Sequence, residues 1–219
     1  MGQGIATSYL QIFSEQLQIP VKQLKVVQGD TDLVEGHGSV GSRSLFVGGN
    51  AILRGIEDFL EECKQLAASE LEASMEDLEY HQGNFQVKGT RVGIGIFDLC
   101  SRQSDNSISV KRKKELTGRS WPNGCHVAEV EIDAETGEVR LDRYVSVDDV
   151  GNTVNPMIVH GQVQGGIASG LGQAVLERTE YDASGQLLSG SYMDYALPRA
   201  CLLYTSDAAD DMQCVDLGG

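Results

Sequence analysis

The chain has 219 residues, a formal net charge of −15 and 41% hydrophobic residues. This length allows a buried core in one or two domains. The acidic balance argues against a nucleic-acid partner, which selects basic surface, and against an anionic membrane surface. The sequence has no apolar run of the roughly 20 residues that a membrane span needs, and we expect a cytoplasmic protein.

The five cysteines, at positions 63, 100, 125, 201 and 214, are widely spaced and form no CxxC or CxxH pair. Zinc sites and iron–sulfur clusters need closely grouped ligands, so this spacing argues against either in this chain. Free thiols in a reducing compartment are the expected state.

Apolar residues at helical spacing predict a first helix over Gly4–Leu17. Gln3 stands just ahead of it, between Gly2 and Gly4. A polar residue bracketed by glycines at a helix start is suited to contact an anion, because amide groups are exposed there. A simple helix cap is the competing interpretation, and the residues alone leave both open.

A short strand over Leu24–Gln28 and a turn over Gly29–Asp32 are predicted next. Gly36–Gly49 follows as a loop rich in glycine and serine, with one basic residue, Arg43. Backbone N–H groups and hydroxyls of such a loop can cradle phosphate. The loop lacks the GKS or GKT ending of a nucleoside-triphosphate site, and a merely flexible loop is the alternative.

The middle of the chain reads as an amphipathic helix followed by short strands. The predicted elements are a helix over 51–70, a hairpin over 78–81 and 85–87, an extended run over 91–94 and a helix over 97–102. Cys63 is assigned to core packing, and His81 to the surface. The basic run KRKK at 111–114 receives no function.

A long hairpin is predicted from strands over 125–132 and 139–147, joined by the turn DAETG. It leads through a turn at 148–155 into a helix that begins near Pro156 and contains five glycines within twelve residues. Each glycine costs a helix up to about 1 kcal/mol relative to alanine, so close approach of a ligand or a backbone is expected to offset them. His126 and His160 show no carboxylate at a useful spacing and receive no catalytic or metal role.

Four blocks in order resemble one enzyme family. They are MGQG at 1–4, GDTD with GSVGSRSLFVGGNA over 29–51, VDDVGNTVNPMIVHGQVQGGIASGLGQAVLE over 147–177, and SGSYMDYALPRA over 189–200. Together they resemble the molybdenum-cofactor-binding subunit of the xanthine dehydrogenase and aldehyde oxidase family, which includes aerobic carbon monoxide dehydrogenase. The resemblance covers about residues 1–200.

The resemblance implies a cofactor-binding set and an oxidoreductase activity. The positions that match the family's cofactor contacts are Gln3, Gly4, Gly41, Ser42, Ser44 and Gln162. The implied cofactor is molybdopterin in its cytosine dinucleotide form, with FAD and [2Fe-2S] on partner subunits or domains, a small-molecule substrate and a homodimeric assembly. The family's catalytic glutamate lies beyond the last block, so no catalytic base is assigned here, and the chain alone is expected to be inactive.

Residues 201–219 depart abruptly from this pattern and resemble translated sequencing adaptor, so we expect a non-native tail. The fold class expected for residues 1–200 is α/β of mixed α+β type, with mixed sheets packed against amphipathic helices, as part of a molybdopterin-binding domain. The alternative function is a non-catalytic nucleotide-binding or scaffold module, because no self-contained acid–base pair is visible.

Overall fold

A computed structural model describes residues 2–33, 36, 38–111 and 120–199. The KRKK run beyond Lys111 and the tail at 201–219 lie outside the described residues. The chain divides into two compact units, residues 1–120 and 121–219, and each is described by itself. Helices and antiparallel sheets make up both, which confirms the expected mixed class.

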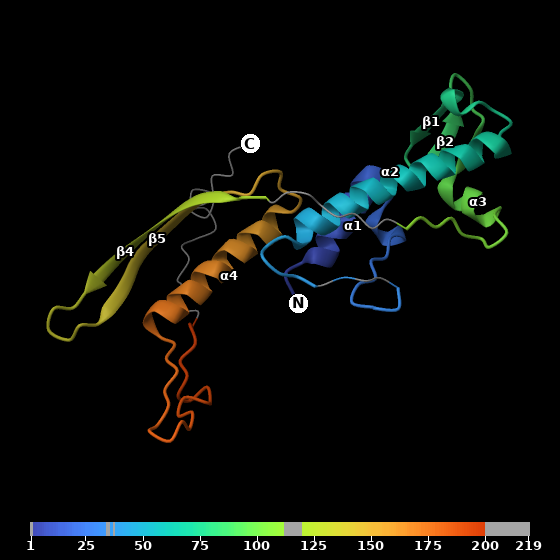
Figure 1. Cartoon of the computed structure of the whole chain (residues 1–219). Coiled ribbons are helices and arrows are strands. Elements are labelled where there is room, and N and C mark those ends of the chain that lie inside the picture. The colour runs from blue at the N-terminus through green and yellow to red at the C-terminus, as the bar shows by residue number, and fades with distance from the viewer. Residues whose placement is uncertain (1, 34–35, 37, 112–119, 200–219) are drawn as a thin grey trace. The chain divides into compact units, whose positions relative to one another are not determined.

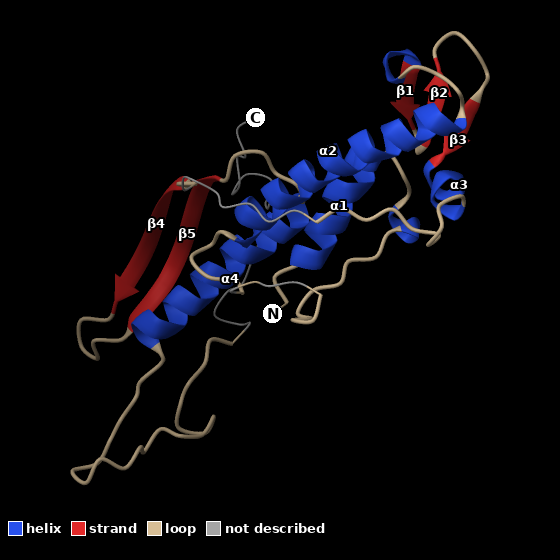
Figure 2. Cartoon of the chain, turned by 45° about the vertical axis from the view of Figure 1, so that its right-hand side comes forward, coloured by secondary structure: helices blue, strands red, loops and turns tan. Residues whose placement is uncertain are grey.

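The first unit is built on two helices that pack lengthwise. Helix α1 (Ile5–Leu17) lies beside the N-terminal half of the longer α2 (Ser44–Glu70), as Figures 1 and 2 both show. Leu17, Ile19 and Ile56 are buried at this contact, and partly buried side chains surround them. The apolar stripes predicted for both helices are therefore confirmed as their packing faces.

A small sheet covers the other half of α2. Strands β1 (Leu78–His81), β2 (Asn84–Val87) and β3 (Gly93–Gly95) pair antiparallel in that order, and α3 (Ile96–Ser101) follows. The short 3-10 helices η1 (Val21–Gln23) and η2 (Met75–Asp77) precede them. The apolar side chains of α2, of the three strands and of α3 enclose a second buried cluster that includes Cys63, Ala67, Leu78, Phe85 and Leu99. Cys63 is fully buried, which confirms its assignment to the core.

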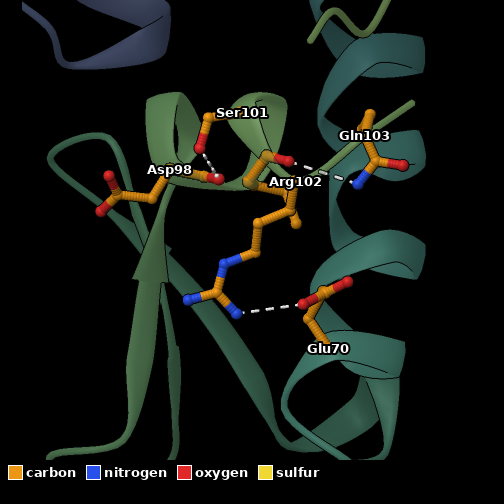
Figure 3. Close-up of polar contacts among 6 residues, drawn as sticks. Glu70, Asp98, Ser101, Arg102 and Gln103 are labelled. Carbon is orange, nitrogen blue, oxygen red and sulfur yellow. Dashed lines mark hydrogen bonds and ion pairs between the residues drawn. The ribbon is translucent and has the colours of Figure 1, made fainter. Parts of the chain in front are cut away.

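One ion pair links the end of α3 to the end of α2, and a side-chain hydrogen bond closes the end of α3 itself (Figure 3). Arg102 Nη1 donates to Glu70 Oε2 at 3.0 Å, and Gln103 Nε2 donates to the Leu99 carbonyl at 3.2 Å. The ion pair is partly exposed, so it contributes at most about 1 kcal/mol. Apolar burial around Leu99 therefore provides most of the stability at this corner, and the ion pair fixes its geometry.

The second unit is a long hairpin and one helix. Strands β4 (Asn123–Ile132) and β5 (Val139–Asp149) pair antiparallel, with a register shift at Glu129/Val130. Helix α4 (Pro156–Val175) runs alongside the hairpin in both views (Figures 1 and 2). The alternation of side chains puts Val130 and Ile132 on one face of β4 and Val127 on the other.

Several predicted boundaries are wrong. No strand forms over Leu24–Gln28; Leu24 instead packs against the cluster between α1 and α2. The predicted loop ends at Arg43, because α2 already begins at Ser44. Asp148 and Asp149 end β5 rather than forming a turn.

In the part of the chain that the structure describes, no helix has both the length and the apolar character to cross a membrane.

Tyr80 provides a pH-dependent test of the first unit. Its hydroxyl donates to the Leu17 carbonyl at 2.5 Å and so ties β1 to the end of α1. Burial raises the pKa of Tyr80 to about 12, and burial likewise raises the pKa of the Cys63 thiol to about 12. In the unfolded chain a tyrosine hydroxyl has a pKa near 10 and a cysteine thiol a pKa near 8.5, so both groups ionise more easily there than in the folded chain.

Stability from these neutral groups is thus complete below about pH 8.5 and is lost as the pH rises toward 12. We expect Tyr80→Phe to lower the free energy of unfolding by about 1 kcal/mol at pH 8, through the lost hydrogen bond. The difference in the free energy of unfolding between Tyr80→Phe and the unmodified chain should narrow at pH 11, because only the unmodified chain loses stability through ionisation of Tyr80. Urea unfolding at the two pH values measures this, and a gap that widens with pH would contradict it.

Candidate functional site

The first site element is the glycine-bracketed start of α1. Gly4 takes the N-cap position with a left-handed backbone, φ 76°, and Gly2 has φ 83°. Glycine adopts this conformation without the cost that a Cβ adds. No side chain caps the helix, and its first turn contains no acidic residue. The first amide groups of α1, next to Gln3, are therefore available to an anion.

The second element is the loop that enters α2. Gly41 and Ser42 both have left-handed backbones, with φ 61° and 51°. Ser44 begins the helix, and its hydroxyl donates to Ser39 Oγ at 2.6 Å. Here too no side chain caps the helix and no acidic residue occupies the first turn. A left-handed backbone at a non-glycine residue is uncommon and marks Ser42 as conformationally constrained.

Tyr9 joins these two elements. Its hydroxyl, on α1, donates to the Ser44 carbonyl in the first turn of α2 at 2.9 Å. The ring fits there because residue 48 is glycine: a Cβ at Gly48 would lie 1.8 Å from the Tyr9 oxygen. One turn further along α1, Ile12 lies against Gly49. Burial raises the pKa of Tyr9, so the hydroxyl stays a donor.

These contacts run in the same direction along both helices, so α1 and α2 are parallel and start at the same end. Five of the predicted site residues therefore gather at one end of the first unit, in the two helix entries: Gln3, Gly4, Gly41, Ser42 and Ser44. Gln162 belongs to the second unit, on α4. Two adjacent helix N-termini present amide donors and the positive ends of two helix dipoles.

Close approach of a ligand or of another backbone was expected to explain the glycine pattern of α4. Among the described residues only Gly172 has close neighbours, and they are side chains, so the ligand explanation stays a prediction. Asn155 Oδ1 accepts the Ile158 N–H at 3.1 Å and caps the helix, and Pro156 occupies its first turn. A Cβ at Gly172 would meet Pro198 and Glu177. Around the other four glycines, at positions 161, 165, 166 and 170, nothing described lies within 4 Å of an added Cβ.

His126 has carboxylate and hydroxyl partners that the sequence interpretation missed. Its Nε2 lies 3.0 Å from Asp148 Oδ1, and its Nδ1 lies 3.0 Å from the Tyr144 hydroxyl. The statement that His126 lacks a carboxylate partner is therefore wrong. The hairpin register would have revealed the pair, because His126 is opposite Ser146, and Tyr144 and Asp148 are its diagonal neighbours on the same face.

Asp148 is held closely in this group. Its side chain is 18% exposed, and a Cβ at Gly124, directly opposite, would lie 2.7 Å from its Oδ1. Oδ2 is buried and has no hydrogen-bond partner among the described residues. His126, Tyr144, Asp148 and Gln162 line the polar part of one cavity between the hairpin and α4.

The donor set decides which kinds of group these residues can hold. Among the described residues no cluster of three His, Cys, Asp or Glu side chains could hold a metal ion directly. The amide-rich end of the first unit instead suits a phosphate or another anionic oxygen group, and glutamine side chains both donate to and accept from a heterocycle. This arrangement fits an anionic organic ligand that is held through its oxygen atoms.

Comparison with known proteins agrees with this chemistry. Residues 1–203 match the molybdopterin cofactor-binding domain, and the chain belongs to that family. It is 33% identical over 210 residues to the 6-hydroxypseudooxynicotine dehydrogenase complex subunit gamma of Paenarthrobacter nicotinovorans. It is also 33% identical over 208 residues to the carbon monoxide dehydrogenase large chain of Hydrogenophaga pseudoflava. Each match covers 91% of this chain but only 26% of the relative.

Solved structures give the same assignment. A crystal structure of Cu,Mo-CO dehydrogenase matches with a TM-score of 0.77 and 30% identity, over 91% of this chain and 26% of that one. Quinoline 2-oxidoreductase from Pseudomonas putida 86 matches with a TM-score of 0.73 and 33% identity, over 90% of this chain and 27% of that one. The chain thus spans about a quarter of the length of these relatives.

The fit between Tyr9 and Gly48 can be tested with a matched pair of glycine substitutions. Gly48→Ala forces the Tyr9 ring out and breaks its bond to Ser44, whereas Gly55→Ala, also on α2, has nothing within 4 Å of the new Cβ. Both changes gain up to about 1 kcal/mol of helix propensity. We expect Gly48→Ala to be about 1–3 kcal/mol less stable than Gly55→Ala in urea unfolding. Equal stability of the two variants would contradict the fit.

Proposed function

We propose that the chain supplies the cofactor-gripping part of a molybdenum hydroxylase-type oxidoreductase. The observation that carries this proposal is the pair of parallel helices whose first turns lie together, uncapped by side chains and free of acidic residues. A dinucleotide pterin is bulky and anionic, so it needs exposed amide groups and little side-chain obstruction. Both helix entries provide this through Gly4 and Gly41.

Each proposed residue has a role that follows from its position. Gly4, Gly41 and Ser42 expose backbone N–H groups to phosphate or pterin oxygens, and the Ser44 hydroxyl adds a side-chain donor. Gln3 offers its side-chain amide to the edge of the pterin. Gln162, on α4 of the second unit, stays a proposed cofactor contact. The bound cofactor supplies the oxidation–reduction chemistry at its molybdenum. The chain's own residues hold and orient it.

We also propose that the cofactor has the cytosine dinucleotide form and that FAD and [2Fe-2S] are bound by partner subunits or domains. The names of the relatives support this part of the proposal. One is named as the gamma subunit of a dehydrogenase complex and another as a large chain. A homodimer of the full assembly, a small-molecule substrate and a cytoplasmic location belong to the same proposal. The catalytic glutamate expected for such enzymes is proposed to lie outside this chain, and residues 201–219 are proposed to be non-native.

The rival function is a non-catalytic nucleotide-binding or scaffold module. It would also explain the two exposed helix N-termini, but it would not explain the match to the family. The match over residues 1–203 is to a molybdopterin cofactor-binding domain, and it favours the cofactor over a free nucleotide. The two functions differ in a measurable way, because only the first requires the pterin itself to be retained.

Pterin retention can be measured on the chain produced in cells that make molybdopterin cytosine dinucleotide. We expect the purified chain to retain cofactor, detected by pterin fluorescence after release, and Gln3→Ala to retain about tenfold less, the effect of about 1.4 kcal/mol. Gln23→Ala is the matched control, because Gln23 is an exposed glutamine on η1, in the same unit. Equal retention by the two variants would remove Gln3 from the site.

The same preparation tests the expectation that the chain is inactive by itself. Loaded with cofactor, it should not oxidise an aldehyde, an N-heterocycle or carbon monoxide with an artificial electron acceptor. The physical reason is that no described residue is assigned as a general base beside the metal. Substrate turnover by this preparation would refute the expectation while leaving cofactor binding in place.

A further inference from the structure

Ser44, the first residue of α2, is fixed from two sides. Its backbone carbonyl accepts a hydrogen bond from the Tyr9 hydroxyl of α1 at 2.9 Å. Its own hydroxyl donates to Ser39 Oγ at 2.6 Å. Neither Tyr9 nor Ser39 belongs to the set of cofactor contacts predicted from the sequence. The two bonds therefore tie a predicted contact, Ser44, to one residue of α1 and to one residue of the loop before α2.

The backbone between Ser39 and Ser44 forms a bend that the two bonds hold. Gly41 and Ser42, two successive residues of this bend, both have left-handed backbones. The hydrogen bond between the Ser39 and Ser44 hydroxyls closes the bend across its two ends. Ser42 has a Cβ, so its left-handed backbone is energetically unfavourable by itself. The bend therefore depends on contacts that stabilise its ends.

The strain at Ser42 and the net contribution of one hydrogen bond are of the same order in free energy. Loss of one of the two bonds therefore allows other conformations of the bend to compete in the unbound chain. A ligand that needs the bend must then order it on binding. Its apparent affinity falls in proportion to the fraction of chains in which the bend is already formed.

Tyr9 is built into the helix contact, whereas Ser39 lies at the surface. The Tyr9 ring occupies the space beside Gly48, where a Cβ would lie 1.8 Å from its oxygen. Burial raises the pKa of Tyr9, so its hydroxyl stays a neutral donor. Ser39 is exposed, and water competes there for its hydrogen bond. Of the two bonds to Ser44, the one from Tyr9 should therefore contribute more to holding the bend.

We propose that Tyr9 and Ser39 are positioning residues for the cofactor. They act through Ser44, by holding the Gly41–Ser42 bend in the conformation that presents its N–H groups to the ligand. This inference rests on the proposed function, because the ligand is the same cofactor. It assigns to the two residues a role in binding that is separate from their contribution to the stability of the fold.

The test compares Tyr9→Phe with Tyr80→Phe in the chain produced in cells that make molybdopterin cytosine dinucleotide. Tyr80 is the matched control, because its hydroxyl also donates to a helix carbonyl, that of Leu17 at the opposite end of α1. Each substitution removes one hydroxyl and keeps the ring, so both should weaken the fold by similar amounts in urea unfolding. Cofactor retention per mole of protein is measured by pterin fluorescence after release.

We expect Tyr9→Phe to retain about fivefold less cofactor than the unmodified chain, the effect of about 1 kcal/mol, and Tyr80→Phe to retain as much as the unmodified chain. Equal retention by Tyr9→Phe and Tyr80→Phe would overturn the role of Tyr9 and leave cofactor binding in place. An unmodified chain that retains no cofactor would instead overturn the proposed function, and this inference with it.

Ser39 is tested by a loss and its rescue. Ser39→Ala should retain less cofactor, and Ser39→Thr should retain as much as the unmodified chain, because threonine keeps the hydroxyl. Ser69→Ala is the control, since Ser69 is an exposed serine near the other end of α2. Retention by Ser39→Thr as low as that by Ser39→Ala, or equal retention by Ser39→Ala and Ser69→Ala, would overturn the role of Ser39.

Discussion

The contact between Tyr9 and the start of α2 is the constraint on which the first unit depends. It is possible because Gly48 has no side chain, so the ring can reach the Ser44 carbonyl at 2.9 Å. Together with the contact of Ile12 with Gly49 and the buried cluster of Leu17, Ile19 and Ile56, that bond holds the two helices parallel, with their first turns together. Antiparallel helices would separate the same two N-termini by about 20 Å, because α1 has 13 residues. The sequence Gly48-Gly49 is thus best explained by helix packing.

The two units use glycine in opposite ways. In α2, Gly48 and Gly49 are explained within the chain, because Tyr9 and Ile12 lie against them. In α4, four of five glycines have open space where a side chain would be. Each lowers helix stability by up to about 1 kcal/mol, and among the described residues no side chain or backbone packs into the space that these four glycines leave. The Asn155 cap and Pro156 offset part of this loss at the start of α4.

Periodicity in the sequence was sufficient to predict every long helix and the long hairpin, because each has a continuous apolar stripe or a clear alternation. It failed where the deciding contact was distant in sequence. The start of α2 was taken for loop because glycine and serine are frequent over 36–49, and the contacts of α1 with Ser44, Gly48 and Gly49 cannot be read from local sequence. The pair of His126 and Asp148 was missed for a related reason: 22 residues separate them, and cross-strand register joins them.

Electrostatics explains why such a site should rely on backbone. A protein with a net charge of −15 repels an anionic dinucleotide at long range, although salt screens this beyond about 8 Å. Basic side chains could offset the repulsion, yet the two helix entries, residues 2–12 and 38–50, contain a single one, Arg43. Fixed amide dipoles act at short range, and they require no side-chain ordering when the ligand binds. The amide dipoles of two helices can act on one ligand only if the two helix starts are held together. The contact of Tyr9 with Ser44 and Gly48 holds them there.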